Sequence, residues 1–135
     1  MSDALPRWTP RGDARNGWRI LVVDDEEPLR AIACEMLSHL GYGAEAAESG
    51  EAAVARMARG PVPDLVILDV IMPGIGGVEA FRQMRRLHPS LKVLIATGFA
   101  EGSAMEALTA EGASGFIQKP YKLEALAERL RVLLS

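Results

Sequence analysis

The sequence predicts an α/β protein in which helices cover both faces of a parallel β-sheet. Short apolar runs and amphipathic helical segments alternate five times along the chain, as in consecutive βαβ units. The central run, Leu65–Asp69, places four apolar residues directly before a carboxylate, which is typical of a strand buried on both faces. The 135 residues are enough for one domain of this class with a single core.

The first part of the chain contains two strand–helix repeats. Arg19–Val23 is an apolar strand, and Pro28 suits the first turn of the helix expected after it. Gly43–Ala47 is a weaker, alanine-rich strand, and Ser49 suits the N-cap of a helix over residues 51–58. Six apolar residues recur at helical spacing in the first helix and are expected to face the core: Leu29, Ile32, Ala33, Met36, Leu37 and Leu40.

Three further repeats follow. After Leu65–Asp69, the pair Gly76 and Gly77 begins a helix that Pro89 ends. Residues 92–96 and Gly115–Gln118 are the fourth and fifth strands. The last two helices are expected at residues 103–110 and 123–134, and the second of these is clearly amphipathic.

The N-terminal segment differs from the rest. Residues 1–17 contain two prolines and two glycines without apolar periodicity, so we expect a flexible extension, followed by a single domain over residues 18–135. Trp8 and Trp18 lie in or beside this extension. Because exposed tryptophan is costly, these side chains are expected to pack on the domain or on a partner.

Composition excludes several classes of protein. The net charge of −3 and pI near 5.4 argue against direct binding of nucleic acid by this domain. No apolar run is long enough to cross a membrane, and the first residues do not resemble a signal peptide. Cys34 is the only cysteine, which is typical of a cytoplasmic protein without internal disulfides.

Chemically active side chains follow four of the five strands. They are Asp24 and Asp25, Asp69, Thr97, and Lys119. Parallel strands place their carboxyl ends at one edge of the sheet, where α/β proteins bind their ligands. A single aspartate or lysine at a strand end is ordinarily a cap or a solvated charge. Their coincidence at corresponding strand ends indicates a site with three carboxylates, a hydroxyl and an ammonium group.

This set of groups suits phosphoryl transfer. Neighbouring carboxylates raise one another's pKa values unless a cation neutralises them, and a hard divalent ion such as Mg²⁺, or Mn²⁺ in its place, prefers oxygen ligands. A carboxylate beside such an ion can attack phosphorus and become an aspartyl phosphate. The ammonium of Lys119 and the hydroxyl of Thr97 would share the charge of the transferring group.

The same residues resemble those of a known family. The segments Val-Val-Asp-Asp-Glu, Leu-Asp-Val-Ile-Met-Pro-Gly, Ala-Thr-Gly and Lys-Pro are similar to the motifs of receiver domains in two-component response regulators, stand-alone or attached to hybrid kinases. The resemblance extends from about Ile20 to Leu134. It implies a flavodoxin-like doubly wound sheet in the order 2-1-3-4-5 with five helices.

The resemblance also implies a role for each residue. Asp69 corresponds to the phosphoacceptor, and Asp24 and Asp25 to the acidic pair that binds Mg²⁺ with Asp69 and the backbone carbonyl of Ile71. Thr97 corresponds to the switch hydroxyl. Phe116 corresponds to the switch aromatic, and Lys119 to the phosphate-binding lysine, followed by a cis bond to Pro120. The protein is then a phosphoacceptor that assists its own phosphorylation and dephosphorylation, and not an enzyme in the ordinary sense.

The expected partners follow from the same resemblance. A sensor histidine kinase or histidine phosphotransfer protein would supply the phosphoryl group, and the face formed by the fourth helix, fifth strand and fifth helix would then control a downstream protein. Two apolar residues are expected beside the phosphoryl group. Ile71 lies two residues beyond Asp69, and Phe99 lies two residues beyond Thr97. We expect them to exclude attacking water or to leave it poorly oriented, and so to prolong the phosphorylated state.

Two alternatives remain open at the level of sequence. A phosphate-independent interaction module would not use the acidic site at all. An aspartate-nucleophile phosphohydrolase ordinarily carries a second aspartate two residues beyond the nucleophile, and here that position is Ile71.

Overall fold

Five parallel strands form the central layer of the protein, in a computed structural model that describes residues 17–98 and 102–134. The strand order is β2-β1-β3-β4-β5, so the predicted α/β class and the order implied by the family resemblance are both confirmed. The strands are β1 (Arg19–Val23), β2 (Gly43–Ala47), β3 (Leu65–Asp69), β4 (Lys92–Thr97) and β5 (Gly115–Gln118).

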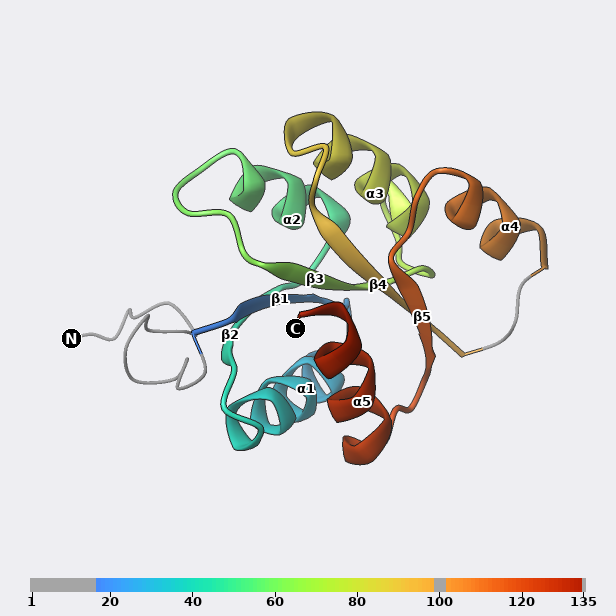
Figure 1. Cartoon of the computed structure of the whole chain (residues 1–135). Coiled ribbons are helices and arrows are strands. Elements are labelled where there is room, and N and C mark those ends of the chain that lie inside the picture. Colours follow the sequence, from blue (N-terminus) through green and yellow to red (C-terminus); the bar gives the residue numbers. More distant parts are fainter. Residues whose placement is uncertain (1–16, 99–101, 135) are drawn as a thin grey trace.

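Helices cover both faces of this sheet. In Figure 1, α1 and α5 lie on one face, and α2, α3 and α4 lie on the other. The helices are α1 (Glu27–His39), α2 (Gly50–Met57), α3 (Gly76–Leu87), α4 (Gly102–Ala110) and α5 (Leu123–Leu133). None of the helices within the described ranges is long and apolar enough to span a membrane.

The interior positions of β1, β3 and β4 are apolar because each of these strands serves two cores. Ile20, Val22 and Ile67 pack with α1 and α5, whereas Leu21 and Leu68 pack with α2, α3 and α4. Successive residues of a strand point to opposite faces, so the central strands must be apolar at every interior position. The polar residue Asp69 comes only where β3 leaves the sheet.

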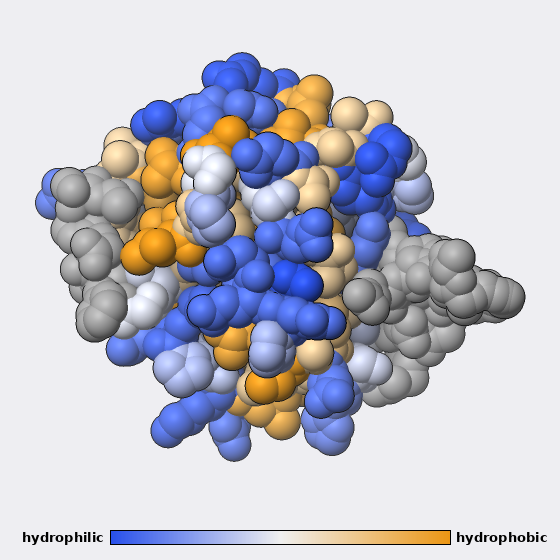
Figure 2. Space-filling view, turned by 180° about the vertical axis from the view of Figure 1, so that it is seen from behind, coloured by the Kyte–Doolittle hydropathy of each residue, from blue (hydrophilic) through white to orange (hydrophobic). Residues whose placement is uncertain are grey.

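The prediction that six apolar residues of α1 face the core is wrong for Ile32. Ala33 and Leu37 are fully buried, but Ile32 is 48% exposed. Only a narrow stripe of α1 lies against the sheet, so Ile32 is left beside a hollow of about 150 Å³ that Pro120 and Tyr121 also line. Figure 2 shows that hydrophobic residues on the rear face form patches between hydrophilic ones.

The boundary between extension and domain can be followed only from residue 17. Trp18 is half-buried and packs against the core below α1 and α5, and its carbonyl oxygen accepts a hydrogen bond from Gly43 N at 2.9 Å. Trp8 and the other residues of 1–16 lie outside the described residues, so the predicted flexibility of that segment stays a prediction.

Gly77 lets α3 approach the end of β3. A Cβ at this position would lie 2.4 Å from the Asp69 carbonyl oxygen and 2.6 Å from Val70 Cα. We therefore expect Gly77→Ala to destabilise the protein by about 1–3 kcal/mol, because backbone must move to admit the methyl group. Without this clash, replacing glycine by alanine would stabilise a helix by about 1 kcal/mol. The sign of the change in unfolding free energy, measured by urea unfolding, therefore tests the close approach.

Gly98→Ala provides the matched control. A Cβ at Gly98 would meet no atom of the described residues within 4 Å. Its unfolding midpoint should stay close to that of the wild type. A Gly77→Ala variant as stable as Gly98→Ala would contradict the close approach of α3 to β3.

Candidate functional site

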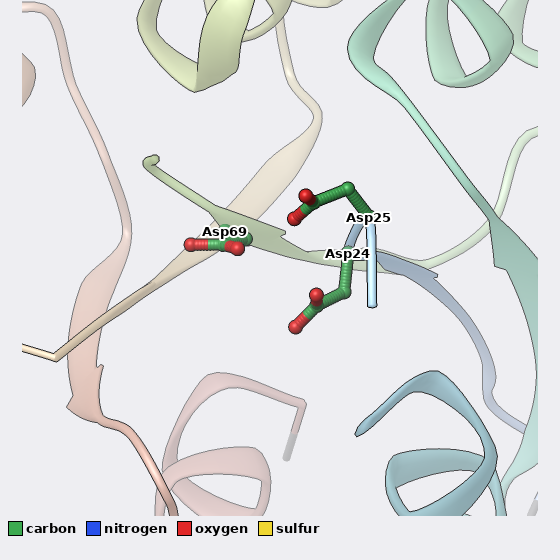
Figure 3. A group of neighbouring side chains, drawn as sticks. All are labelled: Asp24, Asp25 and Asp69. Carbon is green, nitrogen blue, oxygen red and sulfur yellow. The ribbon is translucent and has the colours of Figure 1, made fainter. Parts of the chain in front are cut away.

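The four strand ends bring the predicted side chains together. Asp24 and Asp25 directly follow β1, Asp69 is the last residue of β3, Thr97 is the last residue of β4, and Lys119 directly follows β5. Figure 3 shows Asp24 and Asp25 projecting from the end of β1 into the same region as Asp69. One ligand oxygen from each of the three aspartates lies within 4.8 Å of the others.

The three carboxylates differ in exposure. Asp24 and Asp69 are only 5% and 6% exposed, whereas Asp25 is exposed at the mouth of the site. The backbone fixes the two buried groups: Asp24 Oδ1 accepts a hydrogen bond from Glu26 N at 2.9 Å, and Asp69 Oδ1 accepts one from Ile71 N at 3.1 Å. Their remaining oxygens are thereby oriented toward the interior of the site.

Lys119 joins the two buried carboxylates. Its Nζ donates to Asp24 Oδ2 at 2.9 Å and to Asp69 Oδ2 at 3.1 Å. The sheet places this lysine, because Lys119 N donates to the Thr97 carbonyl oxygen at 2.8 Å. The Lys119–Pro120 peptide bond is cis, as the family resemblance implied.

Burial and charge act in opposite directions on these groups. Burial raises the pKa of Asp69, and the hydrogen bond and positive charge of Lys119 only partly offset it. Burial alone would lower the pKa of Lys119, but its hydrogen bonds to Asp24 and Asp69 raise that pKa above the ordinary lysine value. The ammonium therefore stays protonated at neutral pH beside carboxylates that it does not fully neutralise.

The donor set fits a divalent cation. Three carboxylates and one ammonium leave a formal charge of −2 at the site, and all three aspartates offer oxygen atoms within reach of one ion. Hard cations such as Mg²⁺ prefer oxygen ligands of this kind. An open cavity of about 480 Å³ adjoins these groups and is lined by Asp25, Glu26, Asp69, Ile71, Met72, Pro73, Gly98 and Lys119.

The remaining predicted residues surround this cavity or lie next to it. Ile71 is 62% exposed at its rim. Thr97 is buried at the end of β4, and its neighbour in the sheet, β5, carries Phe116. Phe116 is half-buried against the core on the side of α3 and α4. Phe99 lies outside the described residues.

Two residues near the site were not identified from the sequence. Glu51, on α2, accepts a hydrogen bond from Ile75 N in the loop that follows Asp69. Tyr121 lines a hollow together with Asp24 and Lys119, and burial raises the pKa of its phenol, with a smaller contribution from the charge of Asp24. Glu51 reaches the site only through the fold, whereas Tyr121 directly follows the Lys-Pro motif, and that position was the signal that could have identified it.

Comparison with known proteins identifies the family. A family model described as the response regulator receiver domain matches residues 20–131. The chain belongs to this family. The receiver is 40% identical over 116 residues to the response regulator MprA of Mycobacterium sp. (strain KMS), a match that covers 86% of this chain and 50% of that protein. The chain thus spans about half the length of the MprA relatives that it matches.

The chain also matches a small part of a sensor kinase and nearly the whole of a solved chemotaxis protein. The sensor kinase CckA of Brucella abortus (strain 2308) is 34% identical over 117 residues, which are 86% of this receiver but 12% of the kinase. Among solved structures, the chemotaxis protein CheY4 of Vibrio cholerae aligns with a TM-score of 0.80 at 28% identity, over 87% of this chain and 98% of that chain.

A second solved structure has a title that names a ligand. The response regulator TrrA of Thermotoga maritima, described in complex with Mg(2+)-BeF, aligns with a TM-score of 0.77 at 35% identity. The alignment covers 87% of this chain and 99% of that chain. The chain is therefore similar to complete receivers over their whole length as well as to parts of longer proteins.

Proposed function

We propose that this receiver accepts a phosphoryl group on Asp69 and uses it to change the surface formed by α4, β5 and α5. The observation that carries the proposal is the position of the Asp69 carboxylate. It is buried at the end of β3, bonded through one oxygen to Lys119, and open to a cavity that two further aspartates border or adjoin. Such an arrangement suits a nucleophile whose charge is balanced by cations.

Each residue has a distinct part in the reaction. Asp24, Asp25, Asp69 and the backbone carbonyl of Ile71 would hold Mg²⁺, which when bound neutralises charge on the phosphoryl oxygens. A carboxylate oxygen of Asp69 attacks phosphorus, an O–P bond forms, and the bond from phosphorus to the donor breaks with its electron pair leaving on the donor. Lys119 transfers its hydrogen bond from Asp69 to a phosphoryl oxygen.

Thr97 and Phe116 would couple this event to the surface. The Thr97 hydroxyl moves to bond a phosphoryl oxygen, and the Phe116 side chain turns inward into the space that becomes free. The sheet supports this coupling, because Thr97 ends β4 and Phe116 lies on the neighbouring strand β5, two positions before Gln118, the partner of Thr97. The resulting surface would bind a downstream protein.

The partners that we propose are a sensor histidine kinase or a histidine phosphotransfer protein upstream and a protein target downstream. The relatives include both a response regulator and a sensor kinase, which supports a place in two-component signalling. We place the reaction in the cytoplasm, where such phosphodonors are available.

The experiment that tests the proposal is intact-mass spectrometry after mixing with Mg²⁺ and acetyl phosphate. The expected result is a gain of one phosphoryl group that a chelator prevents and that hydroxylamine removes, since hydroxylamine cleaves acyl phosphates. A receiver that gained no phosphoryl group from this donor or from a histidine kinase would contradict the proposal and favour a phosphate-independent module.

Thr97→Ala should separate phosphorylation from switching. The variant keeps the carboxylates and Lys119, so we expect it to gain the phosphoryl group. Without the hydroxyl it should show none of the changes in amide hydrogen exchange that phosphorylation causes in α4, β5 and α5 of the wild type. Full exchange changes in Thr97→Ala would show that another group couples the two.

Ile71→Asn should shorten the lifetime of the phosphorylated state. Ile71 is 62% exposed at the rim of the cavity, so its apolar side chain faces the path by which water reaches the phosphoryl group. An amide there can orient that water by hydrogen bonding, so we expect a severalfold faster loss of phosphoryl mass. Ile71→Val keeps the side chain apolar and should decay like the wild type; equal decay of all three proteins would refute this role.

A further inference from the structure

The loop between β3 and α3 carries one wall of the phosphorylation cavity. Ile71, Met72 and Pro73 all line the cavity. On its inner side the loop is closed by a hydrogen bond from Gly77 N to the Val70 carbonyl oxygen at 3.1 Å. Its position decides where the Ile71 carbonyl, a proposed Mg²⁺ ligand, points.

The helix that follows this loop lacks a cap of its own. α3 begins at Gly76, its N-cap position is Ile75, and within the described part of the chain no local side chain accepts a hydrogen bond from its first turn. The first backbone N–H groups of a helix need acceptors and carry partial positive charge. By contrast, α2 is capped locally, because Ser49 Oγ accepts a hydrogen bond from Ala52 N at 3.0 Å.

Glu51 supplies the missing acceptor from another helix. Its Oε2 accepts a hydrogen bond from Ile75 N at 3.2 Å. Its carboxylate also lies directly against Gly74, where a Cβ would come within 2.5 Å of Oε2. Gly74 has φ +80, a conformation that favours glycine, so residue 74 both turns the loop and leaves room for the carboxylate.

The start of α2, which carries Glu51, is itself held in place by close packing. Gly50, the first residue of α2, packs so closely that a Cβ there would lie 2.9 Å from both Ala80 Cβ and Ile75 Cγ1. The start of α2 therefore rests on α3 and on the end of the loop. Glu51 thus holds the outer side of the loop while Gly77 holds the inner side.

From this geometry we propose that Glu51 is a positioning residue for the Mg²⁺ site. It fixes the β3–α3 loop, and with it the Ile71 carbonyl, before the ion binds. The inference rests on the proposed function only in that it assumes Mg²⁺ binding at the aspartates. Groups that orient metal ligands typically change metal affinity about 10- to 100-fold when removed. Because Glu51 is exposed and acts through the backbone, we expect the lower end of this range.

The test measures Mg²⁺ binding and loop protection separately on the full chain. Isothermal titration with Mg²⁺ gives the dissociation constant, and amide hydrogen exchange of Ile75 in the metal-free protein reports the hydrogen bond. Glu51→Ala should weaken Mg²⁺ binding about tenfold and accelerate exchange at Ile75. Glu51→Gln keeps an acceptor oxygen and should restore most of both.

Glu35→Ala is the matched control, since it removes the same charge from an exposed position on α1. It should leave both measurements unchanged. Wild-type affinity or unchanged Ile75 exchange in Glu51→Ala would overturn the proposal, and so would equal weakening in Glu35→Ala. If the wild type itself bound no Mg²⁺, the proposed metal site would fail, which differs visibly from a wild type that binds Mg²⁺ as tightly as every variant.

Discussion

Asp69→Asn should abolish phosphorylation of the receiver. The amide oxygen of asparagine is a far weaker nucleophile than a carboxylate. Asp24 and Asp69 are both buried and both bonded to Lys119, but of these two only Asp69 lines the open cavity. In intact-mass spectra with Mg²⁺ and acetyl phosphate, the variant should stay at its unmodified mass while the wild type gains one phosphoryl group. Continued uptake by the variant would move the acceptor to Asp24 or Asp25.

The same substitution should stabilise the metal-free protein, increasingly so at higher pH. Burial raises the pKa of Asp69 above its ordinary value of 3.8 in the folded state. The stability that this carboxyl contributes is therefore fully present below that ordinary value and is lost as the pH rises through the folded pKa. Asparagine does not ionise, so it avoids this loss.

Urea unfolding in the presence of a chelator measures this effect. The difference in midpoint between Asp69→Asn and the wild type should grow in favour of the variant between about pH 4 and pH 7. Other titrating groups are common to the two proteins and largely cancel in the difference. A difference that is independent of pH would contradict the raised pKa, and a stabilised variant also shows that lost phosphorylation is not caused by unfolding.

The sequence was sufficient for the architecture because both of its periodicities were strong. Strands such as β1 and β3 are apolar at every interior position, since they serve two cores, and apolar residues in the helices between them repeat at helical spacing. The strand-end rule then placed Asp24, Asp69, Thr97 and Lys119 at one edge without any knowledge of side-chain contacts. The prediction worked because it depended only on topology.

What failed or was missed depends on packing between distant elements. The exposure of Ile32 is set by how little of α1 meets the sheet, which the spacing of apolar residues in α1 does not specify. The contact of Glu51 with Ile75 joins residues 24 positions apart and requires Gly74 and Gly50 to be small. Each of these glycines is unremarkable by itself, and their joint effect becomes visible only when α2 and α3 lie side by side.

Asp25→Asn should weaken Mg²⁺ binding and stabilise the metal-free receiver at once. In the described structure Lys119 bonds Asp24 and Asp69, so Asp25 adds a negative charge that this ammonium does not bond directly. Removing one charged ligand from a divalent ion should cost about 3 kcal/mol, or roughly a hundredfold in Kd. Removing a like charge from beside two others should raise the unfolding free energy by about 0.5–1 kcal/mol in the presence of a chelator.

Asp25→Asn should lower Mg²⁺ affinity and raise the free energy of unfolding only if the Asp25 carboxylate binds the ion and does not stabilise the fold. Calorimetric titration with Mg²⁺ gives the first, and urea unfolding with a chelator gives the second. Glu26→Gln is the control. Glu26 also lines the cavity, but its carboxylate does not belong to the group of three that could hold one ion. This variant should change Mg²⁺ affinity far less. An Asp25→Asn variant that lost stability without metal would mean that this carboxylate supports the fold, and the acidic pair would then not be a site shaped for a cation.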